Sequence, residues 1–186
     1  MEIKSRYELG DWLNEKGLIE FGVEVGTYNG WFASDILHRW RGKKLYLIDA
    51  WRYLDYWNDE MNANKDEQKN RMCNTFEKVY QFGRRVVMIR ELSQDAALLF
   101  GDHSLDFVYI DADHSYEGVK RDIEIWAPKV KPNGVLIGHD YLDGAQPNGT
   151  IYSVKTAVDE WAQKTSKKIL VIEECKHHEP GWLVYM

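Results

Sequence analysis

The feature that most constrains the fold of this chain is a repeated alternation of short, continuous apolar runs with longer amphipathic stretches. The apolar runs have the length of strands, and the stretches between them repeat their apolar residues at helical spacing. Continuous apolar strands are expected where helices cover both faces of a sheet, and helical crossovers join parallel strands. The expected strands are 21–26, 44–50, 85–90, 105–113 and 134–140, and the expected helices between them are 31–40, 70–82, 93–100 and 116–126.

The two ends of the chain complete this pattern. A helix is expected over 6–16, ahead of the first strand, and another over 151–164. Two strands follow, 168–174 and 181–186, with no helix between them, so we expect them to pair antiparallel at one edge of the sheet. The sequence therefore predicts a doubly wound α/β fold with a mostly parallel seven-stranded sheet and a C-terminal antiparallel strand pair.

Composition narrows the class of protein further. The 186 residues predict one domain, 1–186, without an apolar run of the ~20 residues that a membrane span needs, and the charged N-terminus is not expected to be a signal peptide. The net charge of −6 disfavours a nucleic-acid partner. Cys73 and Cys175 lie far apart without metal-binding spacing, which favours free thiols in a reducing compartment. We therefore expect a cytoplasmic protein that binds neither nucleic acid nor a membrane.

The first strand ends in the turn EVGTYNG at 24–30. Its glycines recur at every fourth position, which differs from the tighter dinucleotide fingerprint and disfavours NAD. Gly26 allows a close backbone turn under a ligand, and Gly30 allows the following helix to pack closely. The acidic Glu24 suits a cationic ligand better than a phosphate. A generic strand-to-helix turn is the alternative interpretation.

The second strand ends at Asp49, 19 residues after Gly30. An acid at about this offset hydrogen-bonds the two ribose hydroxyls of an adenosine ligand. A single aspartate at a strand end is also common as a helix cap or as a solvated loop residue. The combination with the first turn favours ligand binding.

Carboxylates and histidines follow the fourth and fifth strands. Adjacent parallel strands place Asp111, His139 and Asp140 at one rim, where carboxylates repel each other unless a proton or a cation separates them. Aspartate and histidine together can hold a divalent metal. Alternatively, Asp113 caps the next helix and His139-Asp140 forms a hydrogen-bonded turn. For the neighbouring His114, function and packing stay equally open.

Three stretches carry a resemblance to a known family: EVGTYNG, LIDAW, and LDFVYIDADHSYEGVKRDIEIWAPKVKPNGVLIGHDY. They resemble the Rossmann-fold S-adenosylmethionine-dependent methyltransferases, most of all the small branch of macrocin-type sugar O-methyltransferases and cephalosporin-hydroxylase-like proteins. Catechol O-methyltransferase is a more distant relative. The resemblance covers about residues 20–142, and the C-terminal strand pair fits the methyltransferase sheet.

The resemblance implies a binding site for S-adenosylmethionine. Gly26 and its neighbours Glu24, Thr27, Tyr28 and Gly30 would lie at the methionine end. Asp49 would bind the ribose. Residues near the adenine would be Ala50, Trp51 and Ser93. Asp111 belongs to the cofactor site as well as to the metal site.

The resemblance also implies that Asp111, His139 and Asp140 occupy the positions of the metal-using members. Those members usually carry a carboxylate or amide where this chain has His139. Because Mg²⁺ prefers oxygen ligands, a softer divalent ion, or no ion with His139 as the base, stays open beside magnesium.

The function that follows is methyl transfer, most readily O-methylation of a small hydroxylated metabolite. The acceptor hydroxyl needs activation, either by a metal held by Asp111 and Asp140 or by a histidine, His139 or His114, that takes its proton. Two alternatives remain: a cofactor-binding protein of the same fold without methyl transfer, hydroxylase-like or a degenerate partner subunit, and a non-enzymatic interaction module. A homodimer also stays open.

The long connection 51–82 is expected to carry a lid or substrate wall. Tyr53, Tyr56 and Trp57 are its expected substrate-side aromatics, while Phe76 and Tyr80 are expected in the core of the crossover helix. A second flexible rim loop is expected over 140–152, because it contains several turn-forming residues.

Overall fold

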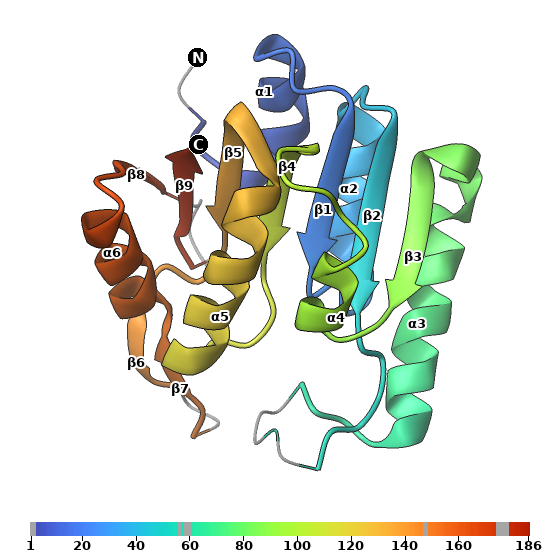
Figure 1. The fold of residues 1–186 in the computed structure, drawn as a ribbon. Coiled ribbons are helices and arrows are strands. Elements are labelled where there is room, and N and C mark those ends of the chain that lie inside the picture. The colour runs from blue at the N-terminus through green and yellow to red at the C-terminus, as the bar shows by residue number, and fades with distance from the viewer. Residues whose placement is uncertain (1–2, 56, 58–60, 147–148, 174–178) are drawn as a thin grey trace.

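The computed structural model describes the chain except for residues 1–2, 56, 58–60, 147–148 and 174–178. Its centre is a seven-stranded sheet with the order β3-β2-β1-β4-β5-β9-β8 (Figure 1). These strands are β1 (Phe21–Val25), β2 (Lys44–Asp49), β3 (Val86–Arg90), β4 (Leu105–Ile110), β5 (Val130–Gly138), β8 (Ile169–Ile172) and β9 (Gly181–Tyr185). The described helices are α1 (Leu9–Glu15), α2 (Trp31–Arg39), α3 (Lys65–Val79), α4 (Ser93–Ala97), α5 (Tyr116–Trp126) and α6 (Val154–Lys164), with short 3₁₀ turns at Arg6–Glu8, Tyr80–Arg85 and Ala127–Lys129.

The sheet confirms the expected topology. Strands β1 to β5 pair in parallel, whereas β9 pairs antiparallel with both β5 and β8. The arrows of the parallel strands therefore end at the same edge of the sheet, where the connecting loops gather (Figure 1). The predicted α/β fold with a C-terminal antiparallel pair is thus confirmed.

Helices cover both faces of the sheet, which explains the continuous apolar strands. Helices α1, α2 and α3 lie on one face and α4, α5 and α6 on the other (Figure 1). In β4 every residue is buried: Phe107 and Tyr109 pack toward the first face, and Val108 and Ile110 toward the second. A strand that is buried on both faces has no solvent-facing side, so it does not need polar residues at alternate positions.

Helix α3 begins at Lys65, five residues before the expected start. Its first turns are polar and offer no apolar periodicity, which is why the sequence pattern missed them. The Asn64 side chain caps the helix, because its Oδ1 accepts hydrogen bonds from the backbone N–H groups of Asp66 (3.1 Å) and Glu67 (3.0 Å). The cap thus supplies the start signal that hydrophobic spacing does not show.

The segment expected as a flexible rim loop instead contains a short hairpin. Strands β6 (Asp143–Ala145) and β7 (Ile151–Ser153) pair antiparallel, and α6 begins only at Val154. The expected helix therefore started three residues too early. The hairpin projects beside α5 at the edge where the parallel strands end (Figure 1). Among the described helices, none is both long and apolar enough to cross a membrane.

The cap of α3 gives a testable expectation for stability. Replacing Asn64 by Ala removes an acceptor from two helix N–H groups, so the free energy of unfolding should fall by about 1 kcal/mol in urea titrations. Asn70→Ala is the matched control, because Asn70 is exposed inside the same helix and caps nothing. It should leave stability unchanged or slightly higher, since Ala has the better helix propensity. Equal losses in both variants would contradict the capping role.

Candidate functional site

A cavity of about 640 Å³ lies at the carboxyl ends of the parallel strands. The sheet's hydrogen bonding continues one residue beyond the strands at this edge. The bonds run from Gly26 N to Ile48 O (2.8 Å), from Asp111 N to Val25 O (2.8 Å) and from His139 N to Ile110 O (3.2 Å). This ladder places the residues that end β1, β2, β4 and β5 at one level. It brings Asp111, His139 and Asp140 to the wall of one cavity, in agreement with the predicted rim, and adds Asp49 to the same wall.

Gly26 makes the close approach of β1 and β4 feasible. Its φ of +87° is in the region that favours glycine, and a Cβ there would lie only 1.9 Å from the carbonyl oxygen of Asp111. Gly30 serves packing instead: its Cβ would lie 2.9 Å from Cα of Thr75 in α3. Gly26 lines the cavity, whereas Gly30 is not among the described lining residues.

Asp49 joins the ends of β1 and β2. Its Oδ2 accepts a hydrogen bond from the backbone N–H of Tyr28, and its Oδ1 accepts one from Trp51, each at 2.8 Å. Burial raises the pKa of the Asp49 carboxyl, although these two bonds and the charge of Arg71 act in the opposite direction. Because a carboxylate offers about four lone-pair positions, two remain for ligand hydroxyls.

The other residues expected to bind cofactor divide into two groups. Tyr28, Ala50 and Ser93 line the cavity with Asp49. The residues not among its described lining are Glu24, Thr27 and Trp51. Trp51 is buried below the turn, where its indole N–H donates to the Tyr28 carbonyl at 2.9 Å. The Ser93 hydroxyl donates to Asp122 (2.7 Å) and accepts from the indole N–H of Trp126 (2.9 Å), so it fixes the wall of α5.

An aspartate–histidine cluster occupies the ends of β4 and β5. His114 Nε2 lies 3.0 Å from Asp140 Oδ2 and 3.4 Å from Asp111 Oδ1, and His139 Nδ1 lies 3.1 Å from Asp140 Oδ2. One potential ligand atom from each of Asp111, His139 and Asp140 falls within a mutual 4.8 Å. Two buried imidazole nitrogens, His114 Nδ1 and His139 Nε2, have no hydrogen-bond partner among the described residues. The cluster therefore has nitrogen and oxygen donors left for a ligand.

Electrostatic interactions within the cluster shift the pKa values of His114, His139 and Asp140. Burial lowers the pKa of His114, but the hydrogen bonds and charges of Asp111 and Asp140 outweigh it and raise that pKa to about 10. For His139 burial again acts downward, and the bond to Asp140 produces a net raised pKa. Burial works to raise the pKa of Asp140, yet the two imidazoles hold it well below its usual range. The cluster thus keeps Asp140 ionised and His114 protonated at neutral pH.

A buried acid and an arginine interact with Asp111 of the cluster. Glu24 is 3% exposed, and burial, reinforced by Asp111 and Asp49, raises the pKa of its carboxyl well above the usual range. Arg6 Nη1 lies 4.0 Å from Asp111 Oδ2. Sequence reasoning missed Arg6, because more than a hundred positions separate it from its partner and no motif marks it.

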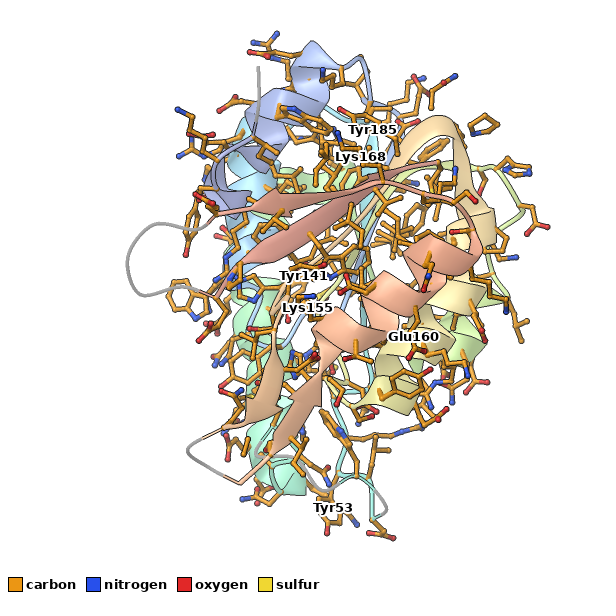
Figure 2. The ribbon with its side chains drawn as sticks, turned by 90° about the vertical axis from the view of Figure 1, so that its left-hand side faces the viewer. Tyr53, Tyr141, Lys155, Glu160, Lys168 and Tyr185 are labelled. Carbon is orange, nitrogen blue, oxygen red and sulfur yellow. The ribbon has the colours of Figure 1, made fainter. Side chains whose placement is uncertain are left out.

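The segment after β2 forms a wall of the cavity. Leu54, Trp57 and Met61 line it, and the Asn62 side chain fastens the segment by bonding the backbone N–H and carbonyl of Leu54 (2.8 and 2.6 Å) and the carbonyl of Trp57 (2.5 Å). Of the three aromatics expected on the substrate side, Trp57 thus lines the cavity. Tyr53 is 44% exposed and points outward at the end of the molecule (Figure 2), and Tyr56 lies outside the described residues.

The expectation that Phe76 and Tyr80 are core residues is wrong. They are 59% and 65% exposed and stack on each other at the surface. The buried side of α3 is mostly polar, because it faces the cavity wall and the turn after β1 rather than the sheet. Its buried residues are Gln68, Arg71, Thr75 and Val79.

The hairpin supplies a further residue that the sequence did not reveal. Tyr152 of β7 lines the cavity and stacks on the His114 ring, with 4.2 Å between centroids and 16° between planes. The next residue, Ser153, donates its backbone N–H to the His114 carbonyl at 2.9 Å. His114 is thereby held on three sides, by Asp111, Asp140 and the hairpin.

Comparison with known proteins places the chain in a family. A family model described as a methyltransferase domain matches residues 23–141, which is more than half of the chain. The chain therefore belongs to the methyltransferase domain family, and its sheet has the Rossmann-type topology of that class. The narrower resemblance to macrocin-type sugar O-methyltransferases stays a prediction.

Two curated relatives are similar over part of their length. Identity is 25% over 122 residues with the uncharacterized protein y4gI of Sinorhizobium fredii, and 27% over 125 residues with the uncharacterized protein R132 of Acanthamoeba polyphaga mimivirus. These matches cover 63% and 65% of this chain. They span only 13% of the first relative and 51% of the second.

Solved structures share the fold over nearly the whole chain. An O-methyltransferase from Bacillus cereus in complex with S-adenosylhomocysteine gives a TM-score of 0.68 at 15% identity, covering 97% of this chain and 80% of that one. The O-methyltransferase TomG from Streptomyces achromogenes in complex with S-adenosylmethionine gives 0.67 at 12%, covering 97% and 78%. An rRNA methylase from Streptococcus thermophilus gives 0.64 at 13%, covering 100% and 98%. At such identities the likeness shows the fold alone.

The buried Asp122 in the cavity wall predicts a pH dependence of stability. Burial raises the pKa of this carboxyl to about 6, whereas its ordinary value is 3.8. Because the folded state binds the proton more tightly, the contribution of Asp122 to stability is fully present below pH 3.8 and is lost as the pH rises through about 6. A shift of this size corresponds to roughly 3 kcal/mol.

Asp122→Asn removes the ionisable group and keeps the shape. Relative to the wild type, the variant should gain stability as the pH rises from 4 to 7 in urea unfolding, with the difference disappearing near pH 4. Asp95→Asn is the control, because Asp95 is exposed on α4. A difference between Asp122→Asn and wild type that stays constant with pH would contradict the raised pKa.

Proposed function

We propose that this protein transfers a methyl group from S-adenosylmethionine to the hydroxyl of a small acceptor. One observation carries the proposal: a chain of the methyltransferase family gathers Asp49, Asp111, His114, His139 and Asp140 around a single cavity. The cofactor complexes of the Bacillus cereus and Streptomyces achromogenes structures support this choice of cofactor. The alternative, cofactor binding without methyl transfer, needs only part of this set.

The cofactor's adenosine is proposed to lie along the ends of β2 and β3. Asp49 accepts hydrogen bonds from both ribose hydroxyls, and the adenine lies against Ala50 and Ser93, which line the same cavity. The methionine part then extends toward Gly26 and Tyr28. Both of these residues line the cavity.

The donor set of the cluster fits a divalent metal. Asp111 and Asp140 offer carboxylate oxygens and His139 offers an imidazole nitrogen, a mixture that suits a softer divalent ion better than Mg²⁺. A bound ion would lower the pKa of an acceptor hydroxyl and neutralise the crowded carboxylates. The unpartnered Nε2 of His139 supports a ligand at this position.

Two histidines are proposed to handle the acceptor's proton. His114 is the better placed, because Asp111, Asp140 and the Tyr152 ring fix its orientation. Because the pKa of His114 is raised to about 10, only a minor fraction of it is neutral at pH 7. That fraction would take the hydroxyl proton at Nδ1 as the hydroxyl oxygen attacks the methyl carbon. The same carboxylates stabilise the imidazolium that forms. His139 is the second candidate, through its free Nε2.

The acceptor is proposed to be a small ring-bearing metabolite. Tyr28, Trp57 and Tyr152 line the cavity, and aromatic faces suit planar or ring-shaped ligands. The net charge of −6 gives no general attraction for polyanions. A cytoplasmic location and a homodimer remain parts of the proposal.

The ribose contact is tested by binding. Asp49→Asn keeps one acceptor for the turn but removes the charge and one ribose acceptor. Calorimetry should show S-adenosylhomocysteine binding about 10- to 100-fold more weakly, the scale of hydrogen bonds to a charged group. Asp102→Asn is the control, because Asp102 is exposed and pairs with Lys129 away from the cavity. Unchanged affinity in Asp49→Asn, with its thermal stability preserved, would rule out this contact.

The reaction is tested with labelled cofactor. The protein is incubated with S-adenosylmethionine carrying a labelled methyl group, and with separate metabolite, RNA and protein fractions. We expect label in the metabolite fraction, loss of turnover after chelation and its return on adding Mn²⁺. Asp111→Asn should abolish the return.

Other results of the labelling assay would overturn particular parts of the proposal. Label mainly in RNA or protein would overturn the small acceptor, and an RNA acceptor would agree with the rRNA methylase likeness. Turnover that survives chelation would overturn the metal and leave the histidine route, to be followed by the pH profiles of His114→Ala and His139→Ala.

A further inference from the structure

The cavity lacks an obvious partner for one charged group of its proposed cofactor. S-adenosylmethionine carries a carboxylate at its methionine end, and burying a carboxylate without a partner is costly. The described lining holds six acidic side chains and three arginines, so most of its surface repels an anion. The two histidines of the lining already pair with Asp140, so a buried carboxylate in this cavity needs one of the arginines beside it.

The three arginines differ in burial and position. Arg52 is exposed on the segment after β2. Arg121 is exposed on α5, where its Nη2 lies 3.8 Å from Asp113 Oδ2. Arg71 of α3 is only 6% exposed. A buried cation is the one that gains most from a ligand anion, because little water screens the pair.

Arg71 lies where the proposed methionine end begins. Its guanidinium carbon is 4.5 Å from the centroid of the Tyr28 ring, in the turn that follows β1. Its charge also acts on Asp49, the proposed ribose ligand. Arg71 therefore lies beside the two residues between which the cofactor would pass from ribose to methionine.

The guanidinium is held in place with donors to spare. Nη1 donates to the Met61 carbonyl at 2.6 Å, and Nη2 donates to Glu67 Oε1 at 2.5 Å. These bonds use two of its five N–H groups. Glu67 is half exposed, so it competes only weakly with a ligand carboxylate inside the cavity.

We propose that Arg71 binds the carboxylate of the cofactor's methionine moiety. This inference rests on the proposed function, because it presupposes S-adenosylmethionine in the cavity. It assigns to α3, a helix inserted between β2 and β3, a direct part in cofactor binding. It also gives a role to the buried arginine that α3 directs into the cavity wall.

The test compares two ligands that differ only in the carboxylate. S-adenosylhomocysteine and its decarboxylated analogue, which keeps the amine and the adenosine, are titrated into the wild type, Arg71→Met, Arg71→Lys and Arg52→Met. The wild type should favour S-adenosylhomocysteine by about 10- to 100-fold. Arg71→Met should lose most of that preference through weaker binding of S-adenosylhomocysteine alone, and Arg71→Lys should retain part of it. Arg52→Met should bind both ligands as the wild type does.

The outcomes separate this inference from the proposed function. If the wild type binds neither ligand, S-adenosylmethionine use itself is wrong and the inference falls with it. If Arg71→Met weakens both ligands equally, the arginine only supports the wall through Met61, and the inference is overturned. If the variant keeps the full preference, the inference is also overturned. Should Arg71→Met melt below assay temperature, Arg71→Lys decides the matter, since a retained lysine charge must preserve part of the preference.

Discussion

The site depends on three backbone hydrogen bonds that extend the parallel sheet by one residue. Strand β1 lies between β2 and β4, and Val25 pairs with both Ile48 and Ile110. The residues that follow these partners must then stand at the same level, so Asp49 and Asp111 flank the turn at Gly26. The pairing of Ile110 with Gly138 extends the same level to His139. Any side chain at position 26 would push β1 away from β4 and separate the acids.

This alignment places several carboxylates close together at the wall of one cavity, where they repel one another. The protein offsets this repulsion in two ways. Burial raises the pKa of Glu24 well above its usual range, whereas Asp140 stays ionised between two imidazoles. Arg6 and Arg71 supply positive charge, one beside Asp111 and the other acting on Asp49. The cavity is thus ready for a ligand that brings both a cation and polar hydroxyls.

The sequence predicted what depends on strand order and failed where a side chain reaches across the fold. Apolar runs locate β1, β2, β4 and β5, and parallel pairing alone then brings Asp49, Asp111 and His139 together. Tyr152 stacks on His114 only because a short hairpin forms, and its turn residues read equally well as a flexible loop. The start of α3 depends on the Asn64 cap, and its polar inner face gave no apolar periodicity. For the same reason Phe76 and Tyr80 were misplaced: the apolar residues of α3 are not its buried ones.

The two halves of the cavity are held by different kinds of interaction. The half formed by the strand ends is fixed by backbone bonds of the sheet, which constrain sequence only where a side chain is forbidden, as at Gly26. The opposite wall is fixed by side chains that bond to backbone: Asn62 to Leu54 and Trp57, and both Gln68 and Arg71 to the Met61 carbonyl. Changes in this wall leave the sheet ladder intact, because none of these bonds involves a strand. Residues of this wall can therefore change while the ladder that aligns the acids stays unchanged.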